Sequence, residues 1–191
     1  GLSLGSSYGV VRPLQIPPRR FLPEISSKEH TTLMILHYSL PYHSNGYAIR
    51  SQGLLSGLRN TSWDVIPYTR PGYPLFSEYS GTEREVELSD VDGITYHHLK
   101  VPAMQSMRTD YSNFGDYVEE SAKILESLAR KIRPSLIHEA SSHPTALPAL
   151  IAARRVGIPF VYEVRGLWEI TEVSADLSPS GAEFFELKQI F

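Results

Sequence analysis

The sequence contains no cysteine, and this absence excludes disulfide bonds and thiolate metal sites. It also fits a protein kept in a reducing compartment. An excess of positive charge is missing too: the net charge is −3, whereas a general nucleic-acid-binding protein needs clustered positive charge. No apolar run approaches the length of a membrane span, and the N-terminus lacks the apolar core of a signal peptide. We therefore expect a soluble, cytoplasmic protein that does not bind nucleic acid.

The first 30 residues differ in composition from the rest of the 191-residue chain. Glycine, serine and proline dominate residues 1–30, and no apolar periodicity appears there. The pentapeptides GLSLG and GSSYG match the nucleophile elbow of hydrolases, but the strand and helix that flank an elbow are missing. We predict a flexible tail over residues 1–30 and one domain over residues 31–191.

Alternating strand and helix patterns predict an α/β fold, Rossmann-like, with a mostly parallel sheet flanked by helices. Apolar runs predict strands that begin at Thr31, at Ser62 and at Leu136, and the turn Asp92-Gly93 predicts a hairpin. A further apolar run, residues 158–164, is typical of a strand covered on both faces. The predicted helices cover residues 46–60, 113–133 and 146–155, and a last helix begins near Ser180 and is still running at Phe191. Because that last helix has no partner strand, we expect a fragment of something longer.

The clearest candidate site lies in the strand, helix and strand of residues 134–169. His138 follows the start of the first strand, and Glu163, Arg165 and Trp168 follow the second. Parallel sheets bind ligands beyond the carboxyl ends of their strands, so we expect these side chains to meet at one edge. We also expect Thr145 to cap the helix between the strands. The alternative interpretation is a structural ion pair beside a core tryptophan.

A second candidate segment follows the strand that begins at Thr31. Asn45 and Gly46 precede a helix, and this arrangement lets backbone N–H groups face a phosphate. The single glycine does not make a dinucleotide fingerprint, so a plain turn is the alternative. Arg50, one turn into the helix, either reaches an anion or forms a surface ion pair.

No metal site is predicted. His97 and His98 are adjacent, and neighbouring residues of a strand point to opposite faces, so they cannot share one ion. His138 and His143 lack a carboxylate partner at a recognised spacing.

Three stretches resemble the N-terminal domain of family-four glycosyltransferases with the GT-B fold. They are LHYSLPYHSNGYAIRSQGLLSGL, VDGITYHHL and RPSLIHEASSHPTALPALIAARRVGIPFVYEVRGLWE. Bacterial members that contain YEVRGLWE are the most similar. The resemblance covers about residues 31–191 and has no counterpart for the preceding tail.

The resemblance implies the acceptor-binding half of a retaining glycosyltransferase of the hexosyltransferase type. Its donor would be a nucleotide-diphosphate sugar, its acceptor a glycan or lipid-linked sugar, and no cofactor or obligatory metal would be needed. The backbone at Asn45 and Gly46 would face the diphosphate or transferred sugar, and Tyr47 and Arg50 would shape that loop. His138 would act as the catalytic contact to the sugar. The other cleft residues would be Glu163, Arg165 and Trp168.

Two departures from the family pattern qualify the resemblance. Many relatives have two adjacent glycines where this chain has Asn45-Gly46, and others have a second histidine at the position of Ala140. The donor-binding C-terminal domain is missing, so we expect this chain alone to be inactive. Members often work at the inner membrane face, which leaves peripheral membrane contact open. The alternatives are half of a GT-B nucleotide-sugar epimerase and a non-catalytic interaction module.

Overall fold

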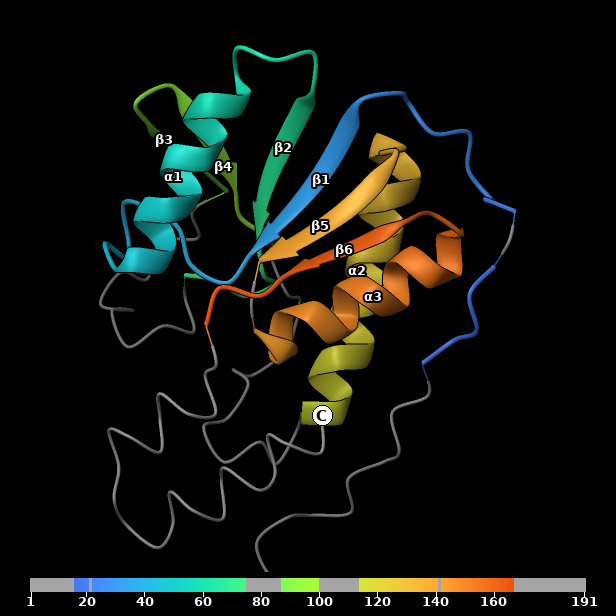
Figure 1. The fold of residues 1–191 in the computed structure, drawn as a ribbon. Helices are drawn as coiled ribbons and strands as arrows, with labels where there is room; N and C mark the ends of the chain where they lie inside the picture. Colours follow the sequence, from blue (N-terminus) through green and yellow to red (C-terminus); the bar gives the residue numbers. More distant parts are fainter. Residues whose placement is uncertain (1–15, 21, 75–86, 100–113, 141, 167–191) are drawn as a thin grey trace, which may run out of the picture.

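Six strands form one sheet in the order β3-β4-β2-β1-β5-β6, and every neighbouring pair except β3 and β4 is parallel (Figure 1). The structure is a computed structural model that describes residues 16–20, 22–74, 87–99, 114–140 and 142–166. Its strands are β1 (Thr31–Leu36), β2 (Asp64–Thr69), β3 (Leu88–Val91), β4 (Ile94–His97), β5 (Leu136–Ala140) and β6 (Phe160–Glu163). Its helices are α1 (Gly46–Leu58), α2 (Phe114–Ile132) and α3 (His143–Val156). This arrangement confirms the predicted α/β, Rossmann-like fold.

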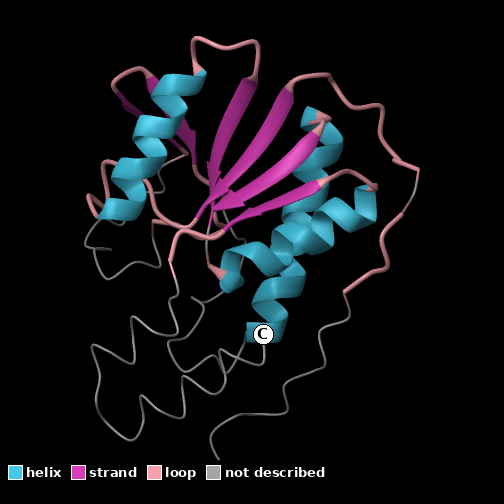
Figure 2. Cartoon of the chain, viewed as in Figure 1, coloured by secondary structure: helices cyan, strands magenta, loops and turns pink. Residues whose placement is uncertain are grey.

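Strand β1 is the centre of the molecule and contributes to the core on both of its faces. Leu33 and Ile35 pack with residues of α2 and α3, whereas Met34 and Leu36 pack with α1 and β4. All four side chains are fully buried. Successive side chains of a strand point to opposite faces, so the uninterrupted apolar run of β1 places one helix layer on each side of the sheet (Figure 2).

Helix α3 begins earlier than its sequence predicts. The helix starts at His143 with Ser142 as its N-cap residue, so the predicted cap at Thr145 is wrong. Pro144 explains the difference, because a proline in the first turn lacks only an N–H that would be unpaired there and has its φ preset for the helix. Pro148 consequently lies inside the helix rather than in its first turn.

Strand β6 is an edge strand, and the prediction that both of its faces are covered is wrong. Val161 and Tyr162 are each 44% exposed. Only β5 pairs with β6 among the described strands. A short apolar run cannot distinguish a central strand from an edge strand.

Two other predictions concern the hairpin and the last helix. The hairpin of β3 and β4 and its turn at Asp92-Gly93 are confirmed. The helix predicted from Ser180 lies outside the described residues.

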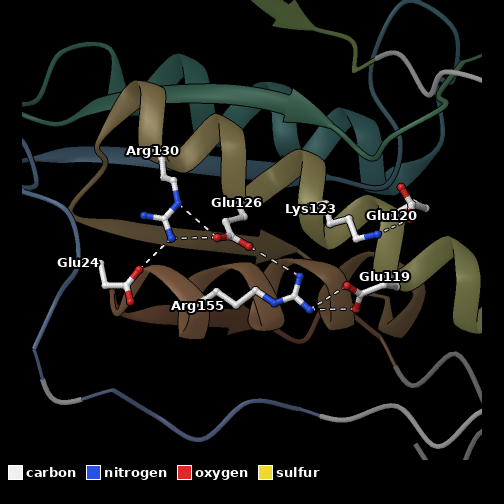
Figure 3. Close-up of polar contacts among 7 residues, drawn as sticks. All are labelled: Glu24, Glu119, Glu120, Lys123, Glu126, Arg130 and Arg155. Carbon is white, nitrogen blue, oxygen red and sulfur yellow. Dashed lines mark hydrogen bonds and ion pairs between the residues drawn. The ribbon is translucent and has the colours of Figure 1, made fainter.

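A ladder of ion pairs joins α2, α3 and the segment before β1 (Figure 3). Arg155 of α3 lies 2.9 Å from Glu119 and 3.7 Å from Glu126 of α2. Arg130 bridges Glu126, at 2.9 Å, to Glu24, at 2.8 Å. Exposed pairs of this kind contribute up to about 1 kcal/mol each to the free energy of unfolding. The ladder therefore fixes the relative orientation of α2 and α3 more than it stabilises the fold.

Part of the segment predicted as a tail contacts the helix layer at Gly157. The glycine ends α3 in the left-handed conformation, with φ of 75°, and the N–H of Glu24 donates to the carbonyl of Val156 at 2.9 Å. A Cβ on Gly157 would lie 2.7 Å from the carbonyl oxygen of Leu22.

We expect Gly157→Ala to lower the free energy of unfolding by about 2 kcal/mol, because it combines the left-handed penalty with this overlap. Urea denaturation measures the loss. Gly53→Ala is the control, since a Cβ there meets nothing within 4 Å and alanine favours a helix by about 1 kcal/mol. Equal midpoints for Gly157→Ala and wild type would contradict the close contact.

Candidate functional site

The topology of the sheet marks one place for a ligand. Strand β1 pairs with β2 on one side and with β5 on the other, and the helices that follow β1 and β5 cover opposite faces of the sheet. Open parallel sheets bind ligands beyond the carboxyl ends of the strands at such a switch point. Four side chains from α1, from β5 and from the end of β6 and the residues just after it meet at this edge. We call them the Glu163 cluster: Arg50, His138, Glu163 and Arg165.

Glu163 is the centre of the Glu163 cluster. Its Oε1 lies 2.8 Å from Nη2 of Arg50, and its Oε2 lies 2.9 Å from Nη2 of Arg165 and 3.3 Å from Nε2 of His138. The ion pair proposed as the alternative for Glu163 and Arg165 is therefore formed. So is the surface ion pair of Arg50, whose side chain is 58% exposed.

Arg165 fixes the first turns of α1. Its side chain is 4% exposed, and its Nη1 donates to the carbonyl of Tyr47 at 3.2 Å and to the hydroxyl of Ser51 at 2.6 Å. Its guanidinium carbon lies 4.9 Å from the centroid of the Tyr47 ring, a cation–π contact. One buried cation thus ties β6 to the helix start, and its position sets those of Glu163 and Tyr47.

The cluster holds one carboxylate and one neutral imidazole. Burial opposes ionisation of Glu163, but the hydrogen bond and charge of Arg165, together with His138 and Arg50, outweigh it and lower the pKa of the carboxyl. Burial lowers the pKa of His138, and the nearby charge of Glu163 only partly offsets it. A neutral His138 can donate from one ring nitrogen and accept on the other, which suits a hydroxyl group.

Glu139, next along β5, is a second carboxyl group at this edge. It is fully buried, and neither carboxyl oxygen has a hydrogen-bond partner among the described residues. Burial raises the pKa of Glu139 to about 9; the charge of Arg165 opposes the rise and that of Glu163 adds to it. Glu139 is consequently protonated at neutral pH, so Glu163 carries the negative charge of the site.

The start of α1 is open at the position of Gly46. Asn45 is the N-cap residue, and its side-chain oxygen accepts from the N–H of Ala48 at 3.0 Å. A Cβ on Gly46 would meet nothing within 4 Å, and its φ does not lie in the left-handed region. Neither packing nor backbone conformation requires glycine there, and its absence of a side chain leaves the helix N-terminus accessible to an anion.

Aromatic rings connect this edge to the turn that follows β2. Tyr38 stacks on His43 with ring centroids 4.3 Å apart and meets Tyr47 edge-on at 6.2 Å. The hydroxyl of Tyr73 donates to the carbonyl of Ser39 at 2.9 Å and lies 2.8 Å from Nδ1 of His43. Tyr73 is 2% exposed, so this buried side chain anchors the loop between β1 and α1 through its contacts with Ser39 and His43.

The structure brings together seven of the eight predicted site residues at one edge of the sheet: Asn45, Gly46, Tyr47, Arg50, His138, Glu163 and Arg165. Trp168 lies outside the described residues. Glu139 and Arg70 were not predicted as site residues. Each stands at or just after the carboxyl end of a parallel strand, which is the signal that identified His138.

Within the described ranges, no group of three or more histidine, aspartate or glutamate side chains is arranged to hold a metal ion. No described helix is long and apolar enough to cross a membrane.

Comparison with known proteins gives one family. The model of a glycosyl transferase 4-like domain matches residues 45–186, a span that begins at the cap of α1 and includes β5 and β6. No curated protein matches the sequence. The matched span holds every residue of the Glu163 cluster and covers well over half of the chain.

Proposed function

This chain belongs to the glycosyl transferase 4-like family, and from that membership we propose that it is the acceptor-binding half of a retaining glycosyltransferase. The donor would be a nucleotide-diphosphate sugar held mainly by a C-terminal domain joined to this one. The acceptor would be a glycan or a lipid-linked sugar, and the enzyme would need no obligatory metal. It would work in the cytoplasm or at the inner membrane face.

One observation carries this proposal: the Glu163 cluster meets the open N-terminus of α1 at the switch point of the sheet. Negative charge develops on the departing diphosphate in sugar transfer, and groups aimed at that charge lower the barrier. The start of α1 supplies backbone N–H groups and the positive end of a helix dipole beside Gly46. Arg50, 58% exposed, is the cation of the cluster that faces solvent.

The other members of the cluster have different roles. His138, held neutral and half-buried beside Glu163, would hydrogen-bond a hydroxyl of the transferred sugar or acceptor. Glu163 would orient the imidazole and fix which ring nitrogen carries the proton. Arg165 is engaged with Tyr47, Ser51 and Glu163, so it would position the helix start rather than contact the substrate.

The test measures donor turnover by a protein that joins this chain to its donor-binding domain. A panel of nucleotide sugars is offered to the wild type and to Gly46→Trp, His138→Ala and Gly53→Trp. We expect Gly46→Trp to reduce sugar transfer about a hundredfold by blocking the helix N-terminus, and His138→Ala about tenfold through one lost hydrogen bond. Gly53→Trp is the matched control, since it also lies on α1 with nothing within 4 Å of its Cβ.

Two outcomes of this experiment would contradict the proposal. If both site variants match the wild type while folding is intact, Gly46 and His138 do not belong to the site. If no donor is used at all, a non-catalytic interaction module replaces the glycosyltransferase as the better hypothesis.

A further inference from the structure

Arg70 is a buried cation that has no anionic partner among the residues that the structure describes. The residue follows β2 directly and is 5% exposed. Its Nε donates to the carbonyl of His37 at 3.3 Å, and its guanidinium lies 5.8 Å from the centroid of Tyr73. Within the described residues it makes no ion pair, whereas Arg130, Arg155 and Arg165 each contact at least one glutamate.

Such an arrangement is costly for the protein by itself. Arginine is almost never this buried unless it is paired, because the charge loses its hydration. The neighbouring groups do not compensate the charge. Burial and then the positive charge of Arg70 lower the pKa of His37, and burial lowers the pKa of His98, near the Tyr73 ring, to about 4. Both imidazoles are neutral at pH 7, so no group in the described part of the chain neutralises the positive charge of Arg70.

The backbone around Arg70 holds it in place. Its own N–H donates to the carbonyl of Leu36 at 2.8 Å, which extends the pairing of β1 with β2. Its carbonyl accepts from the N–H of Tyr73 at 3.2 Å, and the hydroxyl of Tyr117 donates to the carbonyl of Pro71, also at 3.2 Å. The turn after β2 is therefore fixed to β1 and to α2, and the guanidinium is preorganised at the carboxyl edge of the sheet.

We propose that Arg70 binds an oxyanion of the acceptor, either a phosphoryl group or a sugar carboxylate. The planar guanidinium matches both groups with paired hydrogen bonds. The assignment to the acceptor rests on the proposed function, and it follows from position. Arg70 lies at the end of β2, whereas the Glu163 cluster and the start of α1 lie toward β5 and β6, with His37 and the ring of Tyr38 between them.

The first test measures binding of three probes to the 191-residue chain by calorimetry: inorganic phosphate, inorganic pyrophosphate and glucuronate. Phosphate and pyrophosphate against glucuronate separate the two sources of the oxyanion. We expect Arg70→Gln to weaken the preferred probe at least about tenfold and Arg70→Lys to weaken it less, because lysine keeps the charge and loses the paired bonds. Arg59→Gln is the matched control, since this exposed arginine lies at the far end of α1 and loses the same charge.

A thermal melt of the same variants distinguishes binding from a structural role. If Arg70 serves a ligand, Arg70→Gln keeps or raises the melting temperature of the free protein, because it removes an uncompensated buried charge. A marked fall in melting temperature together with unchanged probe binding would overturn the proposal. So would equal binding by Arg70→Gln and Arg59→Gln, or no binding of any probe by the wild type.

The second test uses the two-domain protein and an anionic acceptor. We expect Arg70→Gln to raise the acceptor KM about tenfold while hydrolysis of the donor in the absence of acceptor is unchanged. A raised donor KM instead would refute the acceptor assignment. If the wild type turns over no donor, the glycosyltransferase proposal fails, and the probe-binding result still decides whether Arg70 is an oxyanion site.

Discussion

Glu139→Gln is expected to raise the free energy of unfolding at pH 7 by about 3 kcal/mol more than it does at pH 4. The carboxyl is fully buried without a partner among the described residues, and its pKa rises from 4.5 to about 9. In the unfolded chain the group loses its proton near pH 4.5, whereas the folded protein keeps that proton up to about pH 9. Between these two pH values, ionisation of Glu139 stabilises the unfolded state but not the folded state. The free energy of unfolding therefore falls as the pH rises. Glutamine does not ionise, so Glu139→Gln removes that loss.

Urea denaturation of the wild type and Glu139→Gln at several pH values between 4 and 9 measures this effect. We expect the two proteins to differ by about 1 kcal/mol or less at pH 4 and to diverge as the pH rises. Glu163→Gln is a control of opposite sign, because the lowered pKa of Glu163 contributes stability above pH 4.5 that is lost as the pH falls. Parallel stability curves for the wild type and Glu139→Gln would show that Glu139 is ionised in the folded protein.

The second large effect is expected at Arg165, where alanine should lower the free energy of unfolding by about 3 kcal/mol. The side chain is 4% exposed and makes hydrogen bonds to Tyr47, Ser51 and Glu163. Its removal leaves the Glu163 carboxylate without its buried cation and frees the first turns of α1 from the end of β6. The loss is mostly the cost of the groups left without partners.

Arg50→Ala is the matched control for Arg165→Ala, because both arginines contact the same carboxylate. The Arg50 side chain is 58% exposed, so its ion pair is screened by water and should contribute less than about 1 kcal/mol. Chemical denaturation of both variants, with circular dichroism to verify folding, measures the difference. Losses of equal size would mean that Arg165 is no more essential to the fold than a surface arginine.

Local sequence signals predicted much of the fold. The strand that begins at Thr31, the helix over residues 113–133 and the turn at Asp92-Gly93 were all predicted and are confirmed. The errors lie where local signals compete or where tertiary position decides. Two prolines near the start of α3 allowed two different first turns, and no periodicity reveals that β6 is at the edge of the sheet.

One rule predicted part of the site: side chains that follow parallel strands gather at one edge of the sheet. This rule placed His138, Glu163 and Arg165 together, and their distances bear out that placement. The rule does not say how deeply a side chain is buried or whether it finds a partner. Glu139 and Arg70 therefore looked ordinary in the sequence. What makes them unusual is their burial: among the described residues, the Glu139 carboxyl has no hydrogen-bond partner and Arg70 has no ion pair.

The order of the strands also determines when the site can form during synthesis of the chain. Arg165 and Ser51 are hydrogen-bonded across 114 residues of sequence, and the central pairing of β1 with β5 spans a similar distance. Contacts so far apart along the chain form slowly because a long loop must close first. Before Arg165 emerges from the ribosome, the nascent chain can contain α1 and β2 but cannot contain the Glu163 cluster. The Glu163 cluster is thus among the last features of the described fold to form.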